Sequence, residues 1–297
     1  MNGISPGSYG IGDQRDGVGE GPVWFATTGL WSVDITGKSI RRRELGGATD
    51  RWPAPDLPIA IALGSDDMPG IVAFAQGGAT WMPGCGTGPL LVCPETDPGM
   101  RLNNGKCDPG GRFRVAVMLN NLTADLCPRA LGEPIGRLFP TGSEGAVAAT
   151  EGEFATPNSM AWSPDGTLVH GGDSIRKAIW VWDHDAATGT MGSRHVHVAG
   201  GPGLPDGSAI DADGCLWTAR FGAVCPIRTT PAGETDHVID LPVTNPTSCT
   251  FGGLGGTSRF ITSARFGPDA PKPNEGAALM LADIAAGLTE HRHKGDA

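Results

Sequence analysis

Residues 205–217 read Pro-Asp-Gly-Ser-Ala-Ile-Asp-Ala-Asp-Gly-Cys-Leu-Trp, with the turn-forming pair Asp213-Gly214 between two apolar runs. The same kind of unit occurs at 31–40, 107–113 and 162–168. Glycine adopts the positive φ that tight hairpin turns require, so each unit predicts two antiparallel strands joined by a short turn.

The turn glycines Gly111, Gly166 and Gly214 are about 55 and 48 residues apart, which is the length of one four-stranded propeller blade. Dividing the 297 residues by this period gives roughly six blades. Helical periodicity is poor along the chain, whereas strand-like alternation is good. The sequence therefore predicts an all-β fold, a six-bladed β-propeller. We expect a single domain over residues 1–297, with 1–17 loosely ordered and 289–297 forming a tail.

The composition limits the classes of function. Glycine (47) and proline (25) are abundant but scattered, and charged residues are only 18% of the chain, as in all-β proteins rich in turns. The formal net charge of −10 argues against nucleic acids and anionic membrane surfaces as partners. No apolar run reaches the ~20 residues needed to cross a bilayer. Seven cysteines without a Cys-x-x-Cys pair, and no signal peptide, favour free thiols in the cytoplasm. The composition offers no exposed apolar stripe, so we expect a monomer.

Three oxygen-bearing side chains occupy turn-forming settings at the start of strand-like stretches: Glu20, Asn158 and Asp206. A propeller brings such positions together at its axis, one from each blade, and hard divalent cations bind oxygen ligands. A fourth segment, Arg101-Leu-Asn-Asn-Gly-Lys106, supplies polar groups for a hydroxylated substrate. Taken singly, each of these residues is more often a solvated turn or loop residue.

Together and in this order, the motifs resemble the SMP-30/gluconolactonase/regucalcin-like family of six-bladed propeller lactonases. The resemblance spans roughly residues 18–288. It is carried by five segments: Gly19-Glu-Gly-Pro-Val-Trp24, Arg101-Leu-Asn-Asn-Gly-Lys-Cys-Asp-Pro-Gly-Gly-Arg-Phe113, Asn158-Ser-Met-Ala-Trp-Ser-Pro-Asp-Gly166, Pro205-Asp-Gly-Ser-Ala-Ile-Asp-Ala-Asp-Gly-Cys-Leu-Trp217 and Pro246-Thr-Ser-Cys-Thr-Phe-Gly-Gly253.

The resemblance implies a metal-dependent hydrolase that opens a sugar (aldono)lactone with metal-activated water. It implies that Glu20, Asn158 and Asp206 bind one divalent metal ion, and we expect Asp206 to act also as the general base. Residues 101, 103 and 104 (Arg101, Asn103, Asn104) would bind substrate. The all-oxygen ligand set favours Ca²⁺, with Mg²⁺ and Mn²⁺ next and Zn²⁺ or Fe²⁺ also compatible.

Some positions depart from the family pattern. Asn104 stands where many members have aspartate, and Leu119, Asn120 and Asn121 stand where some have acidic residues. The pocket is therefore predicted to be less acidic, which leaves the identity of the lactone open. The irregular segment 119–147 is a candidate cover for the pocket mouth.

Three other functions remain open from the sequence. They are a propeller esterase or phosphotriesterase-like hydrolase, a metal-dependent isomerase or dehydratase, and a non-catalytic propeller that binds a divalent cation. The chain has neither a Gly-x-Ser-x-Gly nucleophile elbow nor a His-Glu-x-x-His zinc helix, so serine hydrolase and zinc protease mechanisms are not expected.

Overall fold

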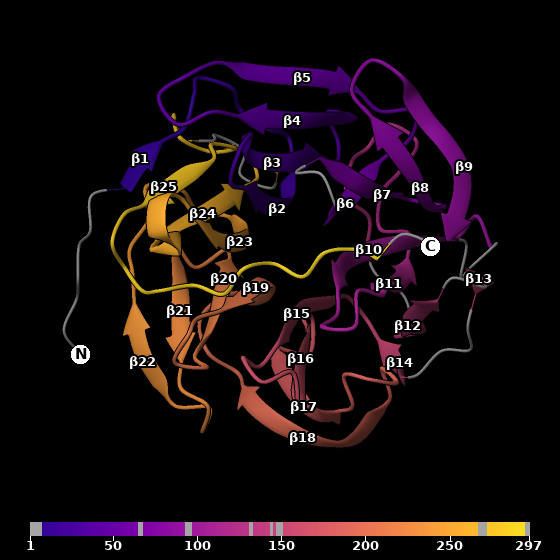
Figure 1. The fold of residues 1–297 in the computed structure, drawn as a ribbon, viewed down its shortest axis with the longest axis vertical. Helices are drawn as coiled ribbons and strands as arrows, with labels where there is room; N and C mark the ends of the chain where they lie inside the picture. Colours follow the sequence, from indigo (N-terminus) through magenta and orange to yellow (C-terminus); the bar gives the residue numbers. More distant parts are fainter. Residues whose placement is uncertain are drawn as a thin grey trace.

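The computed structural model describes residues 8–64, 68–92, 97–130, 133–142, 145–146, 151–266 and 272–294. Six small antiparallel sheets form a ring around a central axis, each connected to the next along the chain (Figure 1). The prediction of an all-β, six-bladed propeller is confirmed.

Each blade runs from an inner strand at the axis to an outer strand at the rim. Neighbouring inner strands contact one another around the ring. The inner strands are β2 (Gly19–Phe25), β6 (Pro58–Leu63), β10 (Met100–Cys107), β15 (Pro157–Trp162), β19 (Leu204–Ile210) and β23 (Pro246–Gly252). The second strands are β3 (Gly29–Asp34), β7 (Pro69–Phe74), β11 (Phe113–Leu119), β16 (Leu168–Asp173), β20 (Leu216–Phe221) and β24 (Ser258–Ser263).

The two remaining positions of each blade lie farther from the axis. The third strands are β4 (Ser39–Arg43), β8 (Gly77–Met82), β12 (Gly136–Gly142), β17 (Ala178–His184), β21 (Cys225–Thr229) and β25 (Leu279–Leu281). The outer strands are β5 (Thr49–Pro53), β9 (Gly86–Val92), β14 (Glu151–Phe154) with the short β13 (Gly145–Ala146), β18 (Met191–Ala199), β22 (Thr235–Val238) and β1 (Ser8–Gly10).

The ring closes in the sheet that contains both ends of the chain. Strand β1 pairs with β25, so residues 8–10 complete the blade that begins at β23. Just after β1, Asp16 is almost fully buried and forms ion pairs with Arg41 and Arg43 of the first blade. Sheet pairing and buried charge therefore hold the first described residues to two blades.

Hydrophobic layers between the sheets make up the core. Trp31 and Trp217 are almost fully buried. The Trp31 ring stacks on Trp52 and meets Trp81 of the next blade edge-on. Burial of this apolar area between neighbouring sheets is the main force that keeps the ring compact. The six cysteines in the described residues are free thiols.

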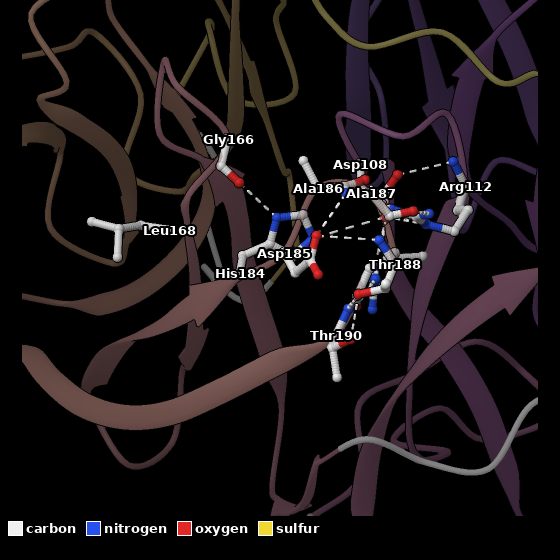
Figure 2. Close-up of polar contacts among 12 residues, drawn as sticks. Asp108, Arg112, Gly166, Leu168, His184, Asp185, Ala186, Ala187, Thr188 and Thr190 are labelled. Atoms are coloured by element: carbon white, nitrogen blue, oxygen red, sulfur yellow. Dashed lines mark hydrogen bonds and ion pairs between the residues drawn. The ribbon is translucent and has the colours of Figure 1, made fainter.

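A polar network joins the third blade to the fourth beneath the β10–β11 turn (Figure 2). Asp108 is fully buried and accepts hydrogen bonds from Arg112 and Arg114. Arg112 also donates to the backbone oxygens of Ala186 and Ala187, at 2.7 and 2.9 Å. The network fixes the turn at the end of β10, the strand that carries the predicted substrate segment.

The C-terminal segment, residues 282–294, crosses the ring at one end of the axis (Figure 1). It is held by backbone hydrogen bonds to several blades: Ala212 N to Ala286 O, Gly287 N to Gly256 O, His293 N to Leu63 O, and Lys294 N to Gly111 O. Its Glu290 forms an ion pair of 3.0 Å with Lys106 of β10. These contacts lie at the ends of the inner strands, opposite the cavity described below.

In the described part of the chain, the one helical element is the 3₁₀ turn Leu254–Gly256, and no helix is long and apolar enough to span a membrane.

Candidate metal and substrate site

The starts of the inner strands carry the predicted site residues, each beside an irregularity in strand pairing. The register with the second strand shifts after Glu20 in β2 and after Asn158 in β15. It also shifts between Pro205 and Ser208, around Asp206 in β19. A bulge of this kind bends the strand and redirects a side chain, here toward the axis.

Glycine follows two of these residues because neighbouring inner strands approach closely at the axis. Gly21 has a φ of +52°, and a Cβ atom there would lie 3.0 Å from Ala60 Cα of the next blade. A Cβ atom on Gly207 would collide with the Ser248 side chain. Each carboxyl group is therefore followed by a residue for which there is no room for a side chain, so glycine is needed at positions 21 and 207.

A cavity of about 190 Å³ opens at this end of the axis. It contains five of the six predicted site residues: Glu20, Arg101, Asn103, Asn158 and Asp206. The rest of its wall is part polar and part apolar, and comes mostly from the ends of the second strands and the loops that follow them. Those residues are Val18, Ile35, Thr36, Asn121, Leu122, Thr156, Ser174, Ile175, Leu204, Phe221, Thr247 and Phe266.

Asn104 does not line this cavity. Its φ is +66°, and its side chain lies in a smaller cavity farther along the axis, where its Nδ2 donates to Asn158 Oδ1 at 3.4 Å. Of segment 119–147, Asn121 and Leu122 line the main cavity, while residues 136–142 and 145–146 are strands of the third blade. Residues 131–132, 143–144 and 147 of that segment lie outside the described residues.

The two carboxyl groups of the site interact directly. Burial raises the pKa of Glu20 to about 7, opposed by a hydrogen bond from Gly21 N, by the charge of Arg101 and by a hydrogen bond with Asp206. Burial and the neighbouring Glu20 charge raise the pKa of Asp206 well above its usual value. Without a cation, the pair holds at least one proton at neutral pH because two adjacent buried charges repel.

A chain of hydrogen bonds fixes the orientation of the Asn158 amide. Ser174 Oγ donates its single proton to Pro205 O at 2.6 Å. It must therefore accept at its 2.9 Å contact with Asn158, which places Nδ2 at Ser174 and leaves Oδ1 for the other side. On that side Asn103 Nδ2 donates to Asn158 Oδ1 at 3.3 Å and to Pro157 O at 3.0 Å. Ser174 is thus a positioning residue for the Asn158 oxygen.

Replacing Ser174 with alanine should weaken divalent-cation binding about tenfold, because the Asn158 amide could then rotate and turn its NH₂ toward the ion. Calorimetric titration with Ca²⁺ measures the affinity, and thermal unfolding without the ion measures the fold. Ser163→Ala, in a turn of the same blade, is the control. A loss of thermal stability with unchanged affinity would assign Ser174 a structural role only.

Arg101 is held from several sides. Its Nη1 donates to Leu102 O and Asn103 Oδ1, and its Nε and Nη2 donate to Asn121 Oδ1. Burial lowers the pKa of Arg101 to about 10, opposed by the Glu20 charge, so the side chain stays cationic at neutral pH. Asn103 uses both ends of its amide for Arg101, Pro157 and Asn158. It therefore orients its neighbours more than it faces the cavity.

The oxygen set fits a hard divalent cation. Glu20, Asp206 and Asn158 Oδ1 offer two carboxylates and one amide oxygen, and an ion with two positive charges would remove the repulsion between the carboxylates. Across the ranges that the structure describes, no three His, Cys, Asp or Glu side chains cluster to form another candidate metal site. The role of this set as metal ligands remains a prediction.

Two contributors to the site, Ser174 and Asn121, were not predicted as site residues from the sequence. Ser174 follows Asp173 at the end of β16, and Asn121 follows β11. Their only sequence signal is position: each lies just after the second strand of a blade, at the same end of the ring as the inner-strand residues.

The chain is similar to known proteins over nearly its whole length. The model of the SMP-30/Gluconolactonase/LRE-like region matches residues 18–265. L-arabinolactonase from Azospirillum brasilense is 32% identical over 294 residues, covering 96% of this chain and 95% of that protein. Regucalcin from Danio rerio is 28% identical and covers 95% and 96% of the two chains. The crystal structure of a calcium-binding protein, regucalcin, from Agrobacterium tumefaciens has a TM-score of 0.90 at 24% identity, covering 99% of this chain and 100% of its own.

The family model covers most of the chain, and the lactonase relative exceeds 30% identity over nearly its full length. The chain therefore belongs to the SMP-30/Gluconolactonase/LRE-like family.

Proposed function

We propose that the protein is a metal-dependent lactonase that hydrolyses the ring ester of a sugar lactone. The observation that carries the proposal is the pair of carboxyl groups, Glu20 and Asp206, which meet at the axis beside the Asn158 oxygen. They lie in a cavity that is also lined by the positively charged side chain of Arg101. The lactonase among the relatives supports the same reaction class.

In this proposal Glu20, Asn158 and Asp206 hold the divalent ion. When bound, the ion supplies Lewis-acid polarisation of the lactone carbonyl and removes the repulsion between the carboxylates. Calcium is the first candidate, since all three donors are oxygens and the similar Agrobacterium tumefaciens protein is described as a calcium-binding protein.

Asp206 is assigned as general base. Its carboxylate accepts a proton from the water that attacks the carbonyl carbon. The backbone of Asp206 is fixed because Ser159 Oγ donates to the Asp206 main-chain oxygen at 2.5 Å. One proton of the water passes to Asp206 and then to the ring oxygen as the acyl–oxygen bond breaks.

Arg101 is assigned to substrate binding. Four of its five N–H groups donate to protein oxygens, and one N–H on Nη2 has no acceptor among the described residues. The guanidinium lines the cavity, so the remaining donor is available to a substrate oxygen. The apolar part of the wall excludes water from the rest of the ligand.

The test is a panel of five- and six-membered aldonolactones, assayed by acid release after chelation and dialysis and then with Ca²⁺, Mg²⁺, Mn²⁺, Zn²⁺ or Fe²⁺ restored separately. We expect no turnover in the dialysed protein and restored turnover with at least one ion. Aryl esters and a phosphotriester are assayed in parallel, and product mass separates hydrolysis, which adds one water, from isomerisation or dehydration. Unchanged turnover after chelation would overturn the metal-dependent scheme, and ion binding without turnover would favour a cation-binding propeller.

A further inference from the structure

Arg101 is a buried charge whose protein partners are all neutral. Its side chain lines the main cavity, and the residue is only 6% exposed. Its acceptors are Leu102 O at 2.8 Å, Asn103 Oδ1 at 2.9 Å, and Asn121 Oδ1 at 2.8 and 3.2 Å. Within the described ranges, no carboxylate forms an ion pair with this guanidinium. Burying a charge is unfavourable unless an opposite charge compensates it.

The other buried arginines in the described part of the chain differ from Arg101. Arg43 pairs with Asp16 at 2.6 Å, and Arg114 pairs with Asp108 at 3.2 Å. Arg220 and Arg259 form no ion pair with a described carboxylate: Arg220 donates to Pro202 O and Gly200 O, and the Arg259 guanidinium lies 3.5 Å from the centre of the Trp217 ring. Neither of these two lines the cavity, whereas Arg101 combines neutral partners with access to a ligand.

Glu20 does not remove the charge of Arg101 in the working site. It is the carboxylate whose charge acts on Arg101, yet in the proposed function it neutralises the metal ion together with Asp206. Two carboxylates balance the two charges of the ion. With the ion bound, the cavity therefore has a net charge of +1, which comes from Arg101. A neutral aldonolactone cannot balance this charge, whereas a ligand with one carboxylate can.

We propose that the substrate is a lactone that carries a free carboxylate, the monolactone of a dicarboxylic sugar acid, and that Arg101 binds this carboxylate while Asn121 determines the preference. The proposal rests on the lactonase function proposed above. Hydrolysis adds one water: the acyl carbon gains the water oxygen, the acyl–ring oxygen bond breaks, the ring oxygen receives a proton, and the product is an open-chain dicarboxylate.

Asn121 is the residue that tests this assignment. Its Oδ1 accepts from both Nε and Nη2 of Arg101, so Asn121→Asp places a carboxylate at the same two contacts without a change of size. The new ion pair would compensate Arg101 from inside the protein and would repel an incoming carboxylate. The matched control is Asn120→Asp, which adds the same charge one residue away. The Asn120 Oδ1 accepts a hydrogen bond from Leu122 N, and the residue does not line the cavity.

The experiment compares two substrates that differ only at C6: the 1,4-lactone of glucaric acid, with a carboxylate, and the 1,4-lactone of gluconic acid, with a hydroxymethyl group. We expect kcat/KM of the wild type to favour the glucaric lactone by about tenfold or more. Asn121→Asp should lower this ratio at least about tenfold, and Asn120→Asp should leave it unchanged. Calorimetric titration with glucarate and gluconate supplies a readout independent of turnover, with weaker glucarate binding expected in Asn121→Asp only.

The outcomes separate the two proposals. Preference for the gluconic lactone, or an equal effect of Asn121→Asp on both substrates, would overturn the anionic substrate while leaving the lactonase function intact. Tight glucarate binding that Asn121→Asp weakens, in a protein that opens neither lactone with any ion, would support the carboxylate site and overturn the lactonase function. Thermal unfolding of both variants checks that the ratios belong to folded protein.

Discussion

Asp206→Asn should reduce lactone turnover by roughly a thousandfold. The amide keeps the size of the side chain but cannot accept a proton from water, and it weakens the cation site by removing one of two carboxylates. Burial and Glu20 raise the pKa of Asp206, so the charged carboxylate is costly for the folded protein. The variant should therefore unfold at the same temperature as the wild type or higher when no ion is present. Loss of activity with undiminished stability is the signature of a functional group that the fold does not need.

The control for this variant is Asp213→Asn, in a turn of the same blade, with a side chain 79% exposed. It removes the same charge and should retain wild-type turnover and thermal stability. Steady-state kinetics on the best aldonolactone, with the preferred ion at saturating concentration, measure both variants. More than a tenth of wild-type kcat in Asp206→Asn would contradict the assignment of the general base.

Without divalent ions, the free energy of unfolding of Glu20→Gln should rise relative to the wild type as the pH increases from about 4.5 to about 7. The ordinary pKa of this carboxyl is 4.5, and burial raises it to about 7 in the folded protein. The folded wild type therefore holds a proton that the unfolded chain releases, so its stability falls through this range. The shift corresponds to up to about 3 kcal/mol, reduced by the water that reaches the half-buried Glu20 from the cavity.

Comparing the two proteins is necessary because buried histidines act in the opposite direction. Burial lowers the pKa of His170 to about 3, so its contribution raises stability as the pH increases up to its ordinary value of 6.5. That contribution is the same in both proteins and cancels in the difference. Urea unfolding at several pH values with a chelator measures the difference, and repeating it with Ca²⁺ should stabilise the wild type more at pH 8 than at pH 5. If the difference in the free energy of unfolding between the two proteins did not change with pH, the pKa of Glu20 would not be raised in the folded protein.

The sequence predicted the ring and the meeting of its distant oxygen donors for a physical reason. The spacing of Gly111, Gly166 and Gly214 reports the length of a blade, because each hairpin corner needs a positive φ. Once six blades are assumed, residues at the starts of inner strands must converge on the axis. Topology therefore brings Glu20 and Asp206 to the same end of the axis, and the local bulges turn their side chains toward it.

Other parts of the site depend on contacts that leave no pattern in the chain. The role of Ser174 arises from a hydrogen bond across to Pro205 in the next blade, and that of Asn121 from a contact with Arg101, twenty residues away. A β-bulge turns Asn104 away from the main cavity, although it follows Asn103 directly. Residues 289–297 were expected to form a tail, whereas residues 289–294 lie across the ring, held by backbone hydrogen bonds and by side-chain contacts of Glu290 and Arg292 with distant strands.

The C-terminal crossing has a kinetic consequence. The segment crosses one end of the axis, where Glu290 pairs with Lys106, and the main cavity lies at the other end. In the proposed reaction, the lactone would enter and the open-chain acid would leave through this same cavity mouth. Accumulating product would compete with substrate for the same opening, so turnover would slow as conversion proceeds even while substrate remains plentiful.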